Sequence, residues 1–315
     1  MIKIAIVGLL ILNLALCHDH PMIGVISYPD SPSDVESSSY IQGETAKFVE
    51  STGARNVVIE YNQDWTTSSE TLEHLNGIII QNSFNGVFTS GTIFKETLLN
   101  AYKYAEAKNE DGIKFPIWAS GVTALQLSEV LSTSKDMSEY TVSIDAMDLA
   151  TSLNFTEHTE ASQEGPIKPL YDIIPTMRSK FLEPAVDSDI VYFDQGIGIT
   201  PASLQKDKFL SEAFQIVATA TDRNGNEFVA LLKHRKFPVI LSFALFEAVY
   251  NFYPDTQIPH SSPATRLTVQ FSKLFTDFSR SNDQTYNSIE KEYSNNLYNR
   301  PMTTTVNKEY QTFYF

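Results

Sequence analysis

The sequence predicts an α/β protein with a mostly parallel central sheet and helices on both faces. Strand patterns alternate with helical patterns through the first half of the chain, an order that places a parallel sheet between helices. Gly77–Ile80 is an uninterrupted apolar run, as expected of a strand buried on both faces. Pro116–Leu127 has the pattern of a buried strand that turns sharply into a helix, and Gly121 supplies the positive φ that such a corner favours.

The first half supplies the parallel strands in order. The apolar, β-branched segment Met22–Tyr28 predicts the first strand, which ends at a Pro-Asp-Ser-Pro loop. A helix is expected next, with Ser39 as its N-cap and Gly53 just past its C-terminus. The remaining elements expected in this half are a strand at Asn56–Tyr61, a short helix over about 69–75, the strand Gly77–Ile80, a helix over about 91–108 and a strand at Phe115–Trp118.

The second half is richer in strand patterns. The four expected strands are Ile190–Phe193, Phe214–Thr219, Phe228–Lys233 and Pro238–Phe243. Asp222–Gly225 predicts a hairpin turn in which Asn224 and Gly225 both take positive φ values. The apolar periodicity of Pro263–Arg280 predicts a last amphipathic helix.

The two ends of the chain differ from the body. Residues 1–17 combine Lys3, a short apolar core and small residues before a polar boundary, which predicts a secretory signal peptide cleaved after Cys17. Residues 18–281 are expected to form one domain. Residues 282–315 are polar with scattered aromatics, and we expect a C-terminal tail with little structure of its own that could still dock on the body or on a partner.

Composition excludes several classes of function. Cys17 is the only cysteine, so the mature chain is expected to have no disulfide, no thiolate metal site and no cysteine nucleophile. The net charge of −15 disfavours nucleic acid and anionic membranes as partners. The six histidines lack metal-ligand spacing, and we expect no metal and no cofactor.

After signal cleavage no segment is long enough to span a bilayer. With the predicted signal peptide, this leads us to expect a secretory-pathway protein, extracellular or in a lysosome or vacuole.

Several stretches together resemble the γ-glutamyl hydrolase family. They are Pro21–Ser27, Tyr40–Gly53, Glu50–Arg55, Leu75–Ile78, Phe115–Trp118, Leu153–Glu157, Phe237–Val239 and Ile258–Pro263. The resemblance covers roughly residues 21 to 280. It implies a class I glutamine-amidotransferase-like fold, which is a flavodoxin-like three-layer architecture.

The resemblance also implies a chemistry whose groups can be checked one by one. Members of the family cleave γ-linked glutamate chains from folates with a cysteine nucleophile, a histidine base and an oxyanion hole near a Gly-rich loop. The nucleophile position falls on Gly121 within Ala119–Thr123, and the base position falls on Leu245. The acid position is kept as Glu247, which we expect at the rim of the pocket.

The rest of the family's site is altered as well. The Gly-rich loop is replaced by Gln81–Phe84, and a further family histidine falls on Asp194. We expect Asn82, Ser83 and Asp194 to line the cleft. Because the nucleophile, the base and the loop are all replaced, the sequence predicts a pseudoenzyme whose cleft binds a small γ-glutamyl or folate-like ligand, or a protein.

Two alternatives remain open. The first is an active γ-glutamyl peptidase that uses other groups, for which Ser120 is a weak substitute nucleophile one residue before the corner. The second is a structural or interaction protein that acts through the C-terminal tail. Independently, Asn154-Phe-Thr156 is an N-glycosylation acceptor sequence, and we expect Asn154 to carry a glycan.

Overall fold

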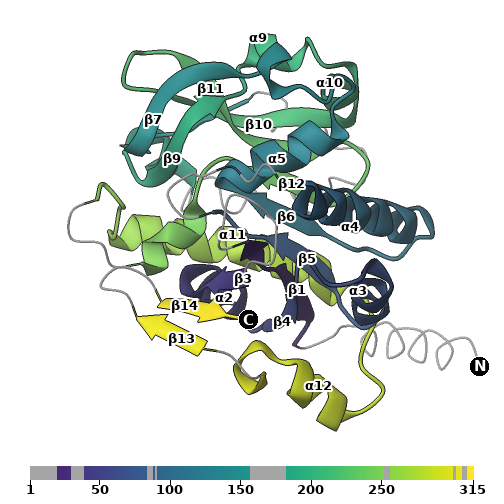
Figure 1. The fold of residues 1–315 in the computed structure, drawn as a ribbon. Coiled ribbons are helices and arrows are strands. Elements are labelled where there is room, and N and C mark those ends of the chain that lie inside the picture. Colours follow the sequence, from purple (N-terminus) through teal and green to yellow (C-terminus); the bar gives the residue numbers. More distant parts are fainter. Residues whose placement is uncertain are drawn as a thin grey trace, which may run out of the picture.

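The fold is built on one eight-stranded sheet (Figure 1). The computed structural model describes residues 20–29, 39–83, 88, 91–156, 182–251, 256–300, 303–306 and 311–315. The strands follow one another across the sheet in the order β4-β1-β5-β6-β12-β11-β10-β8.

The first five strands of that order are parallel and form the central part of the sheet. They are β4 (Arg55–Ile59), β1 (Met22–Ile26), β5 (Gly77–Ile80), β6 (Ile117–Ser120) and β12 (Val239–Ser242). Along the chain these strands come in the order β1, β4, β5, β6, β12, so the strand order reverses between β1 and β5, as in doubly wound flavodoxin-like sheets. The predicted mostly parallel sheet is therefore confirmed.

Antiparallel strands extend this sheet and add two smaller ones. The extension consists of β11 (Glu227–His234), β10 (Phe214–Thr221) and β8 (Asn154–Phe155). A separate pair joins β7 (Val142–Thr151) to β9 (Val191–Gly198). A four-stranded sheet contains β13 (Thr303–Val306), β14 (Gln311–Tyr314), β3 (Ser39–Gln42) and β2 (Tyr28–Pro29), in that order.

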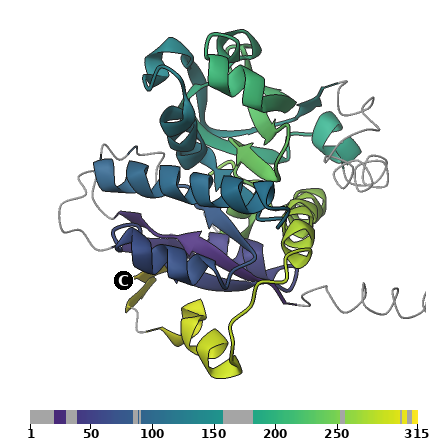
Figure 2. The same cartoon turned by 90° about the vertical axis from the view of Figure 1, so that its right-hand side faces the viewer.

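Helices cover both faces of the parallel strands, as predicted (Figure 2). One face packs against α3 (Trp65–Leu72), α4 (Thr92–Glu110) and α5 (Gly121–Leu131), and the other against α2 (Gly43–Glu50) and α11 (Ser262–Arg280). Alternate residues of one strand point to opposite faces, so Met22 and Ile26 join the first core while Ile23 and Val25 join the second. Shorter elements are α8 (Glu183–Asp187), α9 (Pro201–Leu204), α10 (Lys208–Ala213), α12 (Ile289–Asn295) and the 3-10 turns η2 (Met137–Glu139), η4 (Phe246–Tyr250) and η5 (Leu297–Asn299).

Three local expectations were wrong. Ser39 does not cap α2, because Ser39–Gln42 is strand β3 and the helix begins at Gly43. The helix expected over 69–75 begins earlier, at Trp65, where the Asp64 carboxylate accepts a hydrogen bond from the Thr66 backbone N–H. In the turn after β10 only Gly225 has a positive φ, of 81°, because the Asp222 carboxylate holds the turn by accepting hydrogen bonds from the backbone N–H groups of Asn224 and Asn226.

The C-terminal tail has more structure than expected. Helix α12 lies in it, and β14 pairs with β3 in the body, so that Phe313 lies opposite Ile41 and is 2% exposed. Aromatic residues of the tail therefore dock on the body of the same molecule. The predicted signal peptide, residues 1–17, lies outside the described residues, and none of the helices in the described part has the length and apolar composition needed to cross a membrane.

Candidate functional site at the carboxyl edge of the sheet

The segments that the sequence singled out meet at the carboxyl ends of the parallel strands. Gln81–Ser83 follows β5, Gly121 follows β6 directly, and Leu245–Glu247 comes shortly after β12. Helix α2, which follows β1 by way of β2 and β3, begins at the same edge. In open α/β sheets, ligands bind in the crevice at this edge, where the strand order reverses.

The corner at Gly121 has a backbone that glycine favours and no room for a side chain. Its φ is +57°, in the left-handed region. A Cβ atom at this position would lie 2.3 Å from Asn82 Oδ1 and 2.7 Å from Leu245 Cδ2. The space in which a nucleophilic side chain would stand is therefore filled by Asn82 and Leu245.

Asn82 also accepts a hydrogen bond from a backbone N–H at the corner, and the N–H at the same place in α/β hydrolases takes part in catalysis. Its Oδ1 accepts a hydrogen bond of 2.9 Å from the backbone N–H of Val122, the residue directly after the corner. In α/β hydrolases the N–H of the residue after the nucleophile helps to form the oxyanion hole. Here an amide oxygen of the protein itself already holds that position.

Gln81 ties the loop after β5 to the start of α2. Its side-chain Oε1 accepts a hydrogen bond of 2.8 Å from the Gln42 backbone N–H, and its Nε2 donates one of 2.6 Å to the Tyr40 carbonyl. The Thr123 hydroxyl lies 2.7 Å from the carbonyl oxygens of both Gln81 and Ser120. The loop after β5 is thus hydrogen-bonded to the corner and to β3, directly before α2, a role that its sequence did not predict.

Ser120 and Leu245 do not form a pair of nucleophile and base. Ser120 is 1% exposed, and its hydroxyl oxygen accepts a hydrogen bond of 3.0 Å from the Trp118 indole N–H. Leu245 is buried and packs with Tyr192, Ala248 and Ile258 in a small apolar cluster. A leucine side chain cannot accept a proton from Ser120.

Glu247 is deeply buried and does not lie at the rim of the pocket, contrary to the expectation from sequence. It is 3% exposed, and neither carboxyl oxygen has a hydrogen-bond partner of good geometry in the described part of the chain. Burial raises the pKa of Glu247 to about 7, although the Ser120 hydroxyl and the Glu247 backbone N–H lie close enough to oppose the shift. Burial, together with the charge of Glu247, raises the pKa of the nearby Glu44 to about 8.

The described residues at this edge line a cavity of about 30 Å³. The described lining residues are Gln42, Glu44, Asn82, Ser83, Tyr192, Asp194, Leu245, Ala248, Asn251, Thr256 and Ile258. A cavity of that volume has room for at least one water molecule. The structure thus brings together Asn82, Ser83 and Asp194, whereas Ser120, Gly121 and Glu247 are not among the described lining residues.

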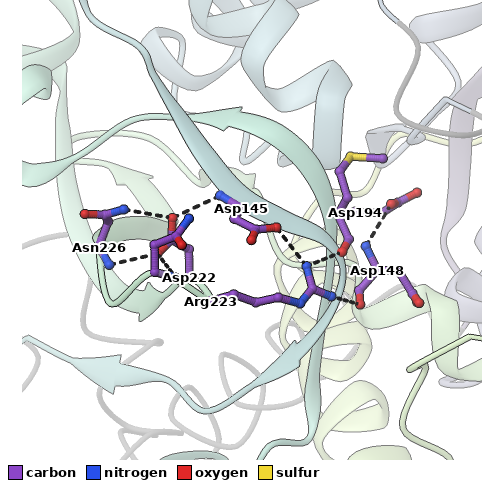
Figure 3. Close-up of polar contacts among 8 residues, drawn as sticks. Asp145, Asp148, Asp194, Asp222, Arg223 and Asn226 are labelled. Carbon is purple, nitrogen blue, oxygen red and sulfur yellow. Dashed lines mark hydrogen bonds and ion pairs between the residues drawn. The ribbon is translucent and has the colours of Figure 1, made fainter.

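Asp194 is held on the cavity wall by a network that reaches the β10–β11 hairpin (Figure 3). Its Oδ1 accepts a hydrogen bond of 3.1 Å from the backbone N–H of Asp148, which has a φ of +45°. The Asp148 carboxylate in turn accepts hydrogen bonds from the Tyr192 hydroxyl and the Gln257 backbone N–H. Burial and the charge of Asp148 raise the pKa of Asp194, while the Asp148 N–H lowers it.

Asn154 lies away from this cavity. It is exposed on β8, where it pairs with Thr219 at the edge of the large sheet. The Thr156 hydroxyl donates a hydrogen bond of 2.9 Å to the Ile216 carbonyl. The acceptor sequence therefore presents its asparagine on the surface, on a different part of the molecule.

Comparison with known proteins finds similar sequences over most of the chain. No protein-family model matches it. Gamma-glutamyl hydrolase B of Dictyostelium discoideum is 26% identical, over 94% of this chain and 83% of that protein. Gamma-glutamyl hydrolase of Glycine max is 28% identical, over 93% of this chain and 84% of that protein, and the enzyme of that name from Mus musculus is 21% identical over 89% and 84%.

Among solved structures, the chain is similar to the structure of PurLQS from Thermotoga maritima. The TM-score is 0.41 and the identity 11%, over 79% of this chain and 97% of that chain. The sequence comparisons show that γ-glutamyl hydrolases are homologues of this chain over roughly nine-tenths of its length.

Proposed function

We propose that this chain is a γ-glutamyl-hydrolase homologue that does not hydrolyse, and that its cleft serves to bind a ligand. One observation carries the proposal: the Asn82 amide oxygen holds the Val122 N–H at 2.9 Å, and it lies 2.3 Å from where a Cβ atom of residue 121 would be. The Asn82 side chain thus leaves no room for a nucleophilic side chain at residue 121. It also accepts the hydrogen bond of the Val122 N–H, a donor that a reacting carbonyl oxygen would need.

The other groups around the corner support the same proposal. Covalent hydrolysis of an amide needs an activated nucleophile, a base within hydrogen-bond reach and free donors for the oxyanion. Gly121 offers no nucleophile, and Leu245 is not a base. Ser120 already accepts the Trp118 N–H and is 1% exposed, so a substrate carbonyl cannot approach it without rearrangement.

We further propose that the protein is made in the secretory pathway and works outside the cell or in a lysosome or vacuole. Residues 1–17 have the composition of a signal peptide, and Asn154 is an exposed acceptor for an N-glycan. In this proposal residues 18–281 form the hydrolase-like domain, and residues 282–315 form a tail that packs on it.

The test is a direct assay of hydrolysis. The purified chain starting at residue 18 is incubated with a folate polyglutamate at acidic and at neutral pH, and free glutamate is measured. The Glycine max gamma-glutamyl hydrolase serves as the positive control. We expect no release above that of the Ser120→Ala variant. Turnover by the wild-type protein that Ser120→Ala abolishes would establish the alternative, a peptidase that uses Ser120.

A further inference from the structure

The chemistry of the cavity indicates the charge of the ligand that it accepts. Two of its lining residues, Glu44 and Asp194, carry carboxyl groups, and no lysine, arginine or histidine is among the described residues that line it. Glu247, also acidic, interacts with Glu44 from η4. Once ionised, these carboxyl groups repel a polyanion such as a glutamate chain and attract a cation. Lys47 also acts on Glu44, but it is not among the described residues that line the cavity.

Two polar atoms of the same lining have no partner among the described residues, which is an independent sign of a missing guest. Within the described ranges neither Gln42 Oε1 nor Ser83 Oγ has a hydrogen-bond partner, although Gln42 is only 2% exposed and Ser83 only 1%. Leaving such a group buried and unpaired is unfavourable. Because an amide oxygen can only accept, the guest that satisfies Gln42 must bring a hydrogen-bond donor.

The remaining lining is apolar, and the cavity is small. Tyr192, Leu245, Ala248 and Ile258 form an apolar cluster that borders the cavity. The volume of about 30 Å³ admits a group at least as large as a water molecule.

We propose that this cavity binds a small primary ammonium group, whose N–H donors pair with Gln42, Glu44 and Asp194, while a short alkyl group faces Leu245 and Ala248. A primary ammonium has three donors and no acceptor, which matches an acceptor-rich lining. The inference rests on the proposed binding role of the cleft. It identifies the ligand class as cationic, opposite in charge to the glutamate chains that the family resemblance implies.

The affinity of the site depends on pH in a predictable direction. The pKa values of Glu44 and Asp194 are both raised, so a bound cation must draw a proton off a carboxyl group before it gains an ion pair. The charged groups that face them are Glu247 and Lys47 around Glu44, and Asp148 beside Asp194. Affinity for an amine that stays protonated should therefore rise as the pH rises from 5 to 8.

Equilibrium dialysis of radiolabelled methylammonium against the chain from residue 18 tests the proposal. We expect one saturable site whose dissociation constant increases at least tenfold in Glu44→Gln and in Asp194→Asn. Glu290→Gln, on the exposed surface of α12, should leave it unchanged. Leu245→Ala enlarges the apolar side of the cavity and should improve the binding of propylammonium.

Several outcomes would overturn the ligand class. These are no saturable binding of methylammonium to the wild-type chain, equal binding by wild type and Glu44→Gln, or displacement of methylammonium by free glutamate at constant ionic strength. Far-UV circular dichroism of each variant shows whether it is folded, and Ser83→Ala gives a milder change in the same lining. Glutamate release in the hydrolysis assay would instead overturn the proposed function, so the two failures can be told apart.

Discussion

Two side chains occupy the space that a Cβ atom at residue 121 would need. Gly121, Asn82 and Leu245 come from segments that follow three different strands, and the Asn82 and Leu245 side chains both lie within 2.7 Å of the position that a Cβ atom of residue 121 would take. Replacing only one of the three therefore cannot create a working site. A cysteine at residue 121 would first have to push aside an amide that is itself hydrogen-bonded to Val122.

This contact makes a stability prediction for Gly121→Ala. The left-handed backbone alone should cost about 1–2 kcal/mol in an L-residue. The overlap with Asn82 and Leu245 should add about 1–3 kcal/mol of overpacking. Urea unfolding is the measurement, and the Asn82→Ala background should recover part of the second amount.

Gly225→Ala is the matched control, because Gly225 has a φ of +81° and nothing within 4 Å of its Cβ position. It should show the backbone cost without the overlap. Equal losses of stability in Gly121→Ala and Gly225→Ala would mean that Asn82 moves away at no cost. The main support for the proposal that Asn82 excludes a nucleophile at residue 121 would then be gone.

Glu247 predicts how stability depends on pH. Its pKa in the folded protein is raised from 4.5 to about 7, so folding favours the protonated form. The resulting stability is fully present below about pH 4.5 and is lost as the pH rises through 7. For this buried group the loss by pH 8 is roughly 3 kcal/mol, at 1.36 kcal/mol per pKa unit.

Chemical denaturation of wild type and Glu247→Gln between pH 4.5 and 8 measures this effect. The variant should lose less stability over the range than wild type does. Glu44, whose pKa is about 8, shifts in the same direction and should keep part of the dependence. Glu290→Gln, at an exposed position, should reproduce the wild-type curve. Identical curves for wild type and Glu247→Gln would contradict the assignment.

The sequence identified some residues of the site and missed others for physical reasons. Asn82, Ser83, Asp194 and Leu245 could be named because they stand at positions that matter in a family that the chain resembles. Gln42 and Glu44 carry no such signal, since a glutamate in the first turn of a helix is ordinary. The burial of Glu247 depends on how η4 packs against α2, which no local pattern records.

At the scale of elements, the β10–β11 hairpin fastens an irregular strand to the cavity wall. Strand β7 shifts register with β9 on either side of Ala146. Across this irregular part, the Arg223 guanidinium donates to the Asp145 carboxylate and to the carbonyl oxygens of Met147 and Asp148 (Figure 3). Asp148 then orients Asp194, so a surface hairpin fixes a residue of the cavity.

Arg223→Ala should therefore loosen β7 locally. The side chain is 41% exposed, so we expect a global loss of only about 1–2 kcal/mol. Hydrogen exchange of the amides of Asp145–Asp148 should accelerate, while that of Met22–Ile26 in β1 stays unchanged. Arg223→Lys should not restore protection, because an ammonium cannot reproduce the planar fork that reaches three oxygens. Full protection in Arg223→Lys would show that charge alone suffices.

The elements that the sequence predicted best are those with an uninterrupted apolar pattern. Gly77–Ile80 matches β5 residue for residue, and the corner at Gly121 has the expected positive φ. Strand β7 was missed because polar residues interrupt it and its pairing is irregular. The sequence pattern predicted a helix start at strand β3, because one of its two partners, β14, lies more than 250 residues away in the chain and the other, β2, is only two residues long.

At the scale of the whole molecule, the tail is part of the folded body. The Asn76 side-chain amide donates to the carbonyl oxygens of Asn282 and Gln284 beside β5. Further along the tail, Arg300 pairs with Glu60 at 2.7 Å. The tail therefore crosses the edge of the sheet at β4 before β14 joins β3. Because β3 ends at Gln42, which lines the cavity, and α2 begins at the next residue, tail packing also supports the cavity.

Phe313→Ala tests how much the tail contributes. Phe313 is 2% exposed and belongs to the core on the α2 and α11 face, so its truncation should cost about 3 kcal/mol and lower the Tm. Tyr293→Ala is the matched control, because this aromatic lies in the same tail at 68% exposure and should change stability by no more than about 0.5 kcal/mol. If the two variants unfold at the same temperature, the tail is peripheral and free to act on a partner. If only Phe313→Ala is destabilised, the tail stabilises the body. A partner lost after deletion of residues 282–315 would then reflect a weakened body, because β3 loses β14, the strand that pairs with it.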